Sequence, residues 1–317
     1  MDKKVFGVDI GGTTIKMGVF SGDGELIDKW EIPTRTEDNG SKILPDIAAS
    51  IRQKMEALSI ERTDVAGIGI SVPGPVDDNG IVHKCVNLGW GVFDIDEEMK
   101  KYTGVPVFAG NDANAAALGE VWRGGGKGYN NAVVVTLGTG VGGGIIVNGK
   151  ILSGSSGAGG EIGHILVNRE ETEKCGCGNK GCLEQYASAT GIARMAKARL
   201  AEDNRDSVMR NAKSMNAKVV FDAVKAGDAV AMEVAEEFGR VLGIGLAIVA
   251  DVVNPEVFVI GGGVSRGGQI VIDYIEKNYN KYVFHASRGV KFALATLGND
   301  AGIYGSAKLV IDGVSGS

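Results

Sequence analysis

Short apolar runs separated by polar or glycine-rich turns dominate the first part of the chain, and this pattern is typical of β-strands. One segment differs, because an isoleucine or methionine recurs at every fourth position from Ile43 to Met55, which predicts an amphipathic helix. In chain order, the pattern predicts strands at residues 5–9, 15–20, 25–32, 65–72 and 105–108 and helices at 41–58 and 113–122. Strands mixed with helices in this way indicate an α/β fold.

The order of the first elements returns in the middle of the chain. A strand at 132–137, a glycine loop at 138–144, a strand at 145–147 and an Asn-Gly turn repeat the arrangement of residues 5–27. We therefore predict a duplicated α/β unit, in which two related domains face each other across a ligand cleft. The remainder is predicted to contain helices at 189–201, 218–226, 229–253, 269–279 and 299–311 and strands at 257–260 and 290–294.

Length and charge narrow the classes of function. A chain of 317 residues is long enough for about two domains. Its net charge of −6 disfavours a general surface for nucleic acid or anionic membranes, and no apolar run is long enough to span a bilayer. The chain starts without the apolar core of a secretory signal, so we expect a reducing cytoplasm. Its 50 glycines gather in loops, where backbone can approach phosphate groups closely.

Three glycine-rich loops are candidates for binding a nucleotide. The spacing of Gly138, Gly140 and Gly143 matches the dinucleotide fingerprint, but a strand is predicted to follow where that fingerprint requires a helix. The chain also lacks the Gly-x4-Gly-Lys-Ser/Thr sequence of a P-loop. One glycine loop alone would be explained as a tight hairpin, but two in matching positions and a third after Ile260 favour binding of a polyphosphate. The candidate residues are Gly11, Gly12, Thr13, Thr14, Gly138, Thr139, Gly140, Gly261, Gly262 and Gly263.

Two aspartates follow predicted strands near these loops. Asp9 ends a strand just before the first loop, where a carboxylate can hold Mg²⁺ through water near the phosphates. Asp112 lies where a strand passes into a helix and is the candidate general base of a phosphoryl transfer, with Asn111 orienting the same hydroxyl. Taken by itself, Asp112 is equally explained as a helix cap.

A histidine and three cysteines follow in a short segment. His164, Cys175, Cys177 and Cys182 supply the ligand set of a closed tetrahedral zinc site. The alternatives are a disulfide with a spare thiol, which a reducing compartment disfavours, and three unconnected buried cysteines. The fourth cysteine, Cys85, is expected to be a lone buried thiol.

Two carboxylates, Glu161 and Glu184, bracket this cluster and are not needed as metal ligands. If a metal fixes the loop, it also fixes where these side chains point. They could bind the hydroxyls of a polyhydroxylated ligand, or they could be solvated surface acids.

These motifs together resemble the ROK family (repressor, open reading frame, kinase), and the resemblance extends over essentially the whole chain. The most specific likeness is Cys175-x-Cys177-Gly-x-x-Gly-Cys182-x-Glu184, which matches the zinc signature of the family, with Glu161-x-Gly-His164 as its companion motif. The first two glycine loops resemble the phosphate motifs and the third resembles the adenosine motif. The resemblance implies the duplicated, ribonuclease-H-like fold shared by sugar kinases, actin and heat-shock ATPases.

The resemblance also implies an activity, that of an ATP-dependent hexose kinase. Among the family, the chain is most similar to bacterial glucokinases, so the expected reaction is the phosphorylation of glucose with Asp112 as the base. Mg²⁺ with ATP and a structural Zn²⁺ are the implied cofactors. The residues implied to hold the sugar are Asn111, Asp112, Glu161, His164 and Glu184, and those implied to hold zinc are His164, Cys175, Cys177 and Cys182.

Several alternatives stay open within the family. Kinases for N-acetylglucosamine, N-acetylmannosamine, fructose and allose share the same motifs, and a non-catalytic sugar sensor could keep the pocket. Repressors of the family carry an N-terminal helix-turn-helix domain; since the Asp9 motif starts close to residue 1, we expect no DNA binding. A homodimer is the family expectation. We expect a smaller domain of residues 1–118 with 298–317 and a larger one of residues 119–297.

Overall fold

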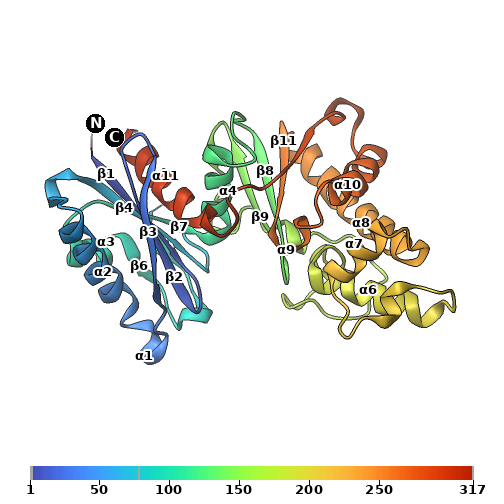
Figure 1. Ribbon diagram of the computed structural model, residues 1–317. Helices are drawn as coiled ribbons and strands as arrows, with labels where there is room; N and C mark the ends of the chain where they lie inside the picture. The colour runs from blue at the N-terminus through green and yellow to red at the C-terminus, as the bar shows by residue number, and fades with distance from the viewer. Residues whose placement is uncertain (1–2, 78, 316–317) are drawn as a thin grey trace.

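The computed structural model describes residues 3–77 and 79–315 and consists of two α/β units side by side (Figure 1). Helices α4 (Asp112–Arg123) and α11 (Ala301–Ser315) lie between the two sheets of these units. The predicted α/β class and the two related units are confirmed, because each unit is built on a five-stranded mixed sheet of the same connectivity.

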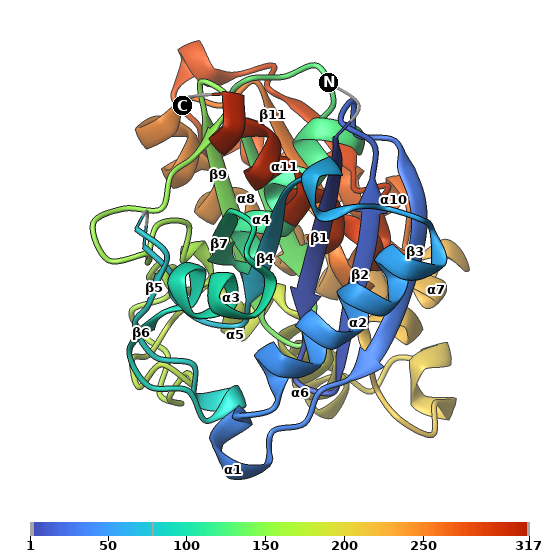
Figure 2. The same cartoon turned by 90° about the vertical axis from the view of Figure 1, so that its left-hand side faces the viewer.

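The first sheet has the strand order β3-β2-β1-β4-β7. Its strands are β1 (Lys4–Ile10), β2 (Thr14–Phe20), β3 (Leu26–Pro33), β4 (Val65–Val72) and β7 (Val107–Asn111). The hairpin strands β1, β2 and β3 are antiparallel, whereas β1, β4 and β7 are parallel. Both faces are covered, since Phe6 and Val8 pack with helix α2 (Ile43–Ala57) while Val5 packs against α11. Figure 2 shows α2 and α3 (Ile95–Thr103) in front of this sheet.

The second sheet repeats this plan with the order β10-β9-β8-β11-β12. Its strands are β8 (Ala132–Leu137), β9 (Val141–Val147), β10 (Lys150–Ile151), β11 (Val257–Gly261) and β12 (Lys291–Leu294). Again the first three strands in the chain are antiparallel and the next two add in parallel. Helix α4 covers one face, and the other packs on a larger helical layer. That layer contains α6 (Ala189–Glu202), α7 (Ala217–Lys225), α8 (Ala229–Val253) and α10 (Gln269–Tyr282).

Helices α4 and α11 pack very closely against each other, because glycines, which have no side chain, lie where the two helices cross. A Cβ on Gly305 of α11 would lie 1.6 Å from the carbonyl oxygen of Ala115 in α4, and one on Gly119 would lie 2.3 Å from that of Ala301. Helix α11 also packs on β1 and β4, so the C-terminal segment returns to the first sheet. The exact domain limits stay a prediction, and residues 1, 2, 78, 316 and 317 of the smaller domain lie outside the described residues.

Two parts of the sequence interpretation were wrong in detail. The second glycine loop is limited to residues 138–140, because β9 begins at Val141 and pairs with β8 through Gly142, Gly143 and Gly144. A Cβ on Gly144 would lie 2.3 Å from that of Ala117, so glycine here allows α4 to pack directly on the strand. Helix α3 was missed, as were the short strands β5 (Ile81–Val82) and β6 (Phe93–Asp94), in a region interpreted as loop.

Within residues 3–77 and 79–315, no helix is both long enough and apolar enough to cross a membrane.

Candidate active site

The glycine loops lie where strands of the two sheets end. The first loop joins β1 to β2 and is closed by a hydrogen bond from Gly11 N to Thr14 O, 3.1 Å long. The second joins β8 to β9 and is closed by one from Gly138 N to Gly140 O, 3.0 Å long. The third passes from β11 into the short helix α9 (Gly262–Ser265) and packs beside the second, since a Cβ on Gly262 would lie 2.5 Å from Leu137 O.

Asp9 lies near the end of β1, just before the first loop. Burial raises the pKa of its carboxyl group, while the hydroxyl of Ser71 and the charge of Lys16 act in the opposite direction. The Ser71 hydroxyl donates to Asp9 Oδ1 over 2.9 Å. A Cβ on Gly302 would lie 2.4 Å from Asp9 Cγ, so the first turn of α11 is pressed against this carboxylate. Glycine at this position therefore makes room for the predicted Mg²⁺-organising group.

Asn111 and Asp112 have different roles at the start of α4. The side chain of Asn111 is the N-cap, because its Oδ1 accepts hydrogen bonds from Ala113 N and Asn114 N over 3.0 and 3.2 Å. Its Nδ2 donates to Gly74 O over 3.1 Å. The N-cap of α4 is therefore Asn111, and not Asp112 as one interpretation of the sequence had it. Asn111 has structural partners for both ends of its amide, and its predicted sugar contact stays a prediction.

The carboxylate of Asp112 is half-buried and accepts a hydrogen bond from Ala113 N over 2.8 Å. Burial raises the pKa of this group, and the negative charge of Asp9 raises it further. The two aspartates, from β1 and from α4, are therefore close enough to interact electrostatically. Gly142 of β9 lies beside Ala113, with 4.0 Å from its ideal Cβ position to the Cβ of Ala113, so α4 also begins next to the second glycine loop.

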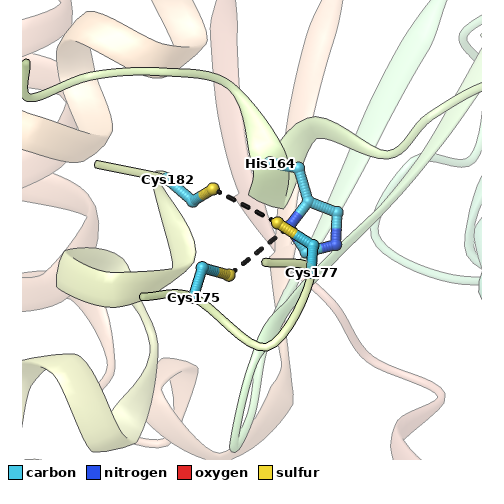
Figure 3. A group of neighbouring side chains, drawn as sticks. All are labelled: His164, Cys175, Cys177 and Cys182. Carbon is cyan, nitrogen blue, oxygen red and sulfur yellow. Dashed lines mark hydrogen bonds between the residues drawn. The ribbon is translucent and has the colours of Figure 1, made fainter. Parts of the chain in front are cut away.

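His164, Cys175, Cys177 and Cys182 converge in one group (Figure 3). One potential ligand atom from each residue lies within 4.8 Å of the others, and all four cysteines of the chain are free, so the disulfide alternative is wrong. His164 Nδ1 is 3.8 Å from Cys175 Sγ, and Cys177 Sγ is 3.6 Å from Cys182 Sγ. Three thiols and an imidazole at this range can hold a metal ion.

Local backbone geometry forms the cysteine loop. Cys175 N donates to Asn179 O over 2.7 Å, which closes a tight turn. Gly178 and Gly181 have φ angles of 92° and 76°, a conformation that favours glycine. Cys85 lies apart, fully buried, and its thiol donates to Pro73 O, as expected for a lone thiol.

The two carboxylates that bracket the metal-binding group differ in environment. The side chain of Glu161 is 62% exposed, with its Oε2 3.8 Å from His164 Nε2. His164 thus turns Nδ1 toward the cysteines and Nε2 toward Glu161. Glu184 is half-buried and is not a solvated surface acid. Its Oε2 accepts a hydrogen bond from Val141 N over 3.0 Å, and its Oε1 accepts one from the thiol of Cys175 over 3.4 Å.

Two cavities accompany these residues. One of about 350 Å³ lies between the two units, where β7, α4 and α11 face the β9–β10 hairpin, and Asn111 is among its lining residues. A second of about 330 Å³ lies between the second glycine loop and the cysteine loop. Its lining includes Thr139, Gly140, Cys175, Glu184 and Thr190. The predicted nucleotide-binding and metal-binding segments therefore share a cavity wall, which sequence spacing alone did not indicate.

Sequence reasoning missed three hydroxyl residues around this site, namely Ser71, Thr34 and Thr190. Ser71 contacts Asp9, whereas the hydroxyls of Thr34 and Thr190 donate to the backbone of the first and second glycine loops. Hydroxyl residues are common throughout the chain, and the partners here are 23 to 62 positions away. No local pattern in the sequence distinguishes them.

Known proteins resemble the chain over nearly its full length. The family model described as "ROK family" matches residues 5–313. A glucokinase from Halalkalibacterium halodurans is 43% identical over 98% of this chain and 95% of its own. The solved structure of a ROK hexokinase from Thermus thermophilus has a TM-score of 0.82 at 31% identity, covering 99% of this chain and 100% of the other. That of a ROK family glucokinase from Streptomyces griseus, in complex with glucose and AMPPNP, has a TM-score of 0.73 at 34% identity, covering 96% and 98%.

Proposed function

Since this chain belongs to the ROK family, we propose that it is an ATP-dependent glucokinase, which transfers the terminal phosphoryl group of ATP to the 6-hydroxyl of glucose. The observation that carries the proposal is the placement of two interacting aspartates beside paired glycine loops. Asp9 and Asp112 each have a raised pKa, and the loops at 11–14 and 138–140 lie next to them. A phosphoryl transfer needs a carboxylate for the attacking hydroxyl and donors for the phosphate oxygens.

Asp112 is the proposed catalytic base. It accepts the proton of the sugar hydroxyl as that oxygen attacks, and its raised pKa makes it a better proton acceptor than an ordinary aspartate. The backbone N–H groups of the two phosphate loops and the hydroxyls of Thr13, Thr14 and Thr139 stabilise charge on the phosphates. The third loop, at Gly261, Gly262 and Gly263, is proposed to contact the adenosine. Closure of the two units on the sugar would exclude water and suppress ATP hydrolysis.

The implied metals fit the residues present. Asp9 is a half-buried carboxylate at the first phosphate loop and would hold Mg²⁺, which when bound neutralises charge on the ATP phosphates. His164 and the three cysteines form the donor set of a closed structural zinc site, whose ion would hold the loop together.

The sugar site is proposed to be formed by Asn111, Asp112, Glu161, His164 and Glu184. Support comes from the position of His164, which turns one ring nitrogen to the thiols and the other to Glu161. One imidazole can therefore serve the metal and the sugar at once. The homodimer expected from the family and the cytoplasmic location expected from the sequence stay predictions.

The experiment is sugar-dependent ADP release with Mg-ATP across glucose, N-acetylglucosamine, N-acetylmannosamine, fructose and allose. Wild type is compared with Asp112→Asn and with a control, Asp222→Asn, at an exposed carboxylate of α7. We expect the highest kcat/KM on glucose, a loss of at least about 100-fold in kcat for Asp112→Asn, and retained glucose binding. Preference for an acetamido sugar would change the substrate and keep the mechanism. Tight sugar binding without turnover on any sugar would instead indicate a sensor.

A further inference from the structure

Each phosphate loop accepts a hydrogen bond from the hydroxyl of a threonine that lies outside the loop. Thr34 Oγ1 donates to the carbonyl oxygen of Gly11 in the first loop, and Thr190 Oγ1 donates to that of Thr139 in the second, both over 2.7 Å. We propose that Thr34 and Thr190 are a pair of positioning residues, which turn the peptide groups of the two loops so that their N–H groups face the phosphates of the nucleotide. This inference rests on the proposed nucleotide-dependent function.

Peptide geometry links the carbonyls to the donors. In a trans peptide the C=O of one residue and the N–H of the next point in opposite directions. Holding the carbonyl of Gly11 therefore orients Gly12 N–H, and holding that of Thr139 orients Gly140 N–H. A third peptide is held in the same way, because Ala189 N donates to Gly138 O over 2.8 Å and so orients Thr139 N–H.

The oriented N–H groups are available for a ligand. Across the described part of the chain, the backbone N–H groups of Gly12, Thr139 and Gly140 donate no hydrogen bond. Carbonyl oxygens carry partial negative charge and would repel a phosphate if the same peptides turned over. Glycine peptides turn easily, since they lack a Cβ. A hydroxyl on each carbonyl removes this freedom before the nucleotide arrives, and such preorganisation increases affinity.

Both threonines are themselves held by secondary structure. Thr34 directly follows β3, and its own N–H donates to Thr13 O over 2.9 Å. Thr190 lies in the first turn of α6, where the hydroxyl of the N-cap Ser188 is 2.9 Å from its own. The anchors come from different elements in the two units, yet each meets the hairpin loop after the first strand of its sheet. The structural duplication thus extends to the support of the phosphate loops.

The test uses Thr34→Val, Thr190→Val and the double variant, which remove a hydroxyl with little change of shape. Thr34→Ser and Thr190→Ser restore it. The matched control is Thr103→Val, since the Thr103 hydroxyl donates to Met99 O over 3.1 Å in α3, away from the phosphate loops. For each variant we would measure the Kd of Mg-AMPPNP and of glucose by calorimetry, the thermal midpoint, and KM for ATP.

Each valine variant is expected to weaken Mg-AMPPNP binding by about threefold to tenfold, the equivalent of one net hydrogen bond. The double variant should multiply the two effects, because the loops are separate. Glucose affinity and the thermal midpoint should stay near wild type, the serine variants should recover nucleotide binding, and Thr103→Val should leave it unchanged. Nucleotide affinity within twofold of wild type in both valine variants, or an equal loss of glucose affinity, would overturn the inference.

The same measurements distinguish a failure of the positioning role from a failure of the proposed kinase function. Wild type could bind Mg-AMPPNP, with weaker binding in the valine variants, and still phosphorylate no sugar. That result would support the positioning role of the two threonines and contradict the proposed kinase activity. If wild type binds no Mg-AMPPNP, the loops do not bind nucleotide and the positioning role is wrong.

Discussion

The carboxylate of Glu184 accepts a hydrogen bond from the backbone N–H of Val141, with 3.0 Å between Oε2 and N. Val141 begins β9 directly after the second phosphate loop, while Glu184 lies two positions after the metal-ligand candidate Cys182. A Cβ on Gly140 would lie 2.1 Å from the same oxygen, so this contact depends on glycine. One side chain therefore connects the metal-binding segment with the phosphate loop.

Two substitutions of Glu184 should distinguish its effect on KM for ATP from its effect on KM for glucose. Glu184→Gln keeps an oxygen that can accept from Val141 N, whereas Glu184→Ala removes it. We expect Glu184→Ala to raise KM for both ATP and glucose by about tenfold, equivalent to a hydrogen bond to a charged group in each case. Glu184→Gln should raise mainly KM for glucose. Equal effects of both variants on KM for ATP would contradict a role of the Val141 contact.

The dependence of activity on pH should reflect Asp112. A general base acts only when it is ionised, and the pKa of Asp112 is raised by burial and by the charge of Asp9. The kcat/KM for glucose should therefore fall on acidification at a pH above the ordinary aspartate pKa of 3.8. Rates between pH 4 and 8, with thermal midpoints at each pH to exclude unfolding, would check this. A flat profile down to pH 4 would argue against Asp112 as the base.

Removal of a cysteine from the metal-binding group should remove the metal. Cys182→Ser is expected to lose bound zinc, measured by mass spectrometry of the purified protein, and to lower the thermal midpoint by about 5 °C or more. The matched control is Cys85→Ser, which changes the one cysteine outside the group. This control should retain zinc even if it loses some stability, because Cys85 is fully buried. Equal zinc content in both variants would contradict the assignment of Cys182 as a required zinc ligand.

Asp96 should make stability depend on pH. Among the residues that the structure describes, its Oδ1 has no hydrogen-bond partner and is buried. Burial, with smaller effects from Asp94 and Glu97, raises its pKa from 3.8 to about 7. The folded protein thus holds a proton that the unfolded chain releases between these values, so wild type loses stability as pH rises through this window.

The amide side chain in the Asp96→Asn variant does not ionise. The variant should therefore not lose stability as the pH rises through this window. Relative to the variant, wild type should lose about 2–4 kcal/mol of unfolding free energy between pH 4.5 and 8, at about 1.4 kcal/mol for each unit of pKa difference. Urea unfolding at both pH values would measure this, with Asp273→Asn at an exposed position of α10 as control. An equal difference at the two pH values would contradict a buried, neutral Asp96.

Most of the fold could be predicted because its signals are local. Apolar runs mark the buried strands, and a period of four residues marks α2, so the repeated order of elements was visible in sequence. The segment Val141 to Gly144 was misread because glycine suggests a loop, whereas pairing with β8 and packing of α4 make it a strand. Helix α3 was missed because Ile95 and Met99 are its only fully buried side chains, which is too weak a periodic signal.

The order of the residues specifies which chemical groups are present and close along the chain: the glycine loops, the three cysteines with His164, and the aspartates at strand ends. How these groups contact one another depends on the packing of the folded chain. The hydrogen bond from the Asn111 amide to Gly74 O, the contact of Glu184 with Val141, and the hydroxyls of Thr34 and Thr190 on the phosphate loops join residues from separate elements. A hydrogen bond requires a distance near 3 Å and a defined direction, and for partners far apart in sequence both are set by packing.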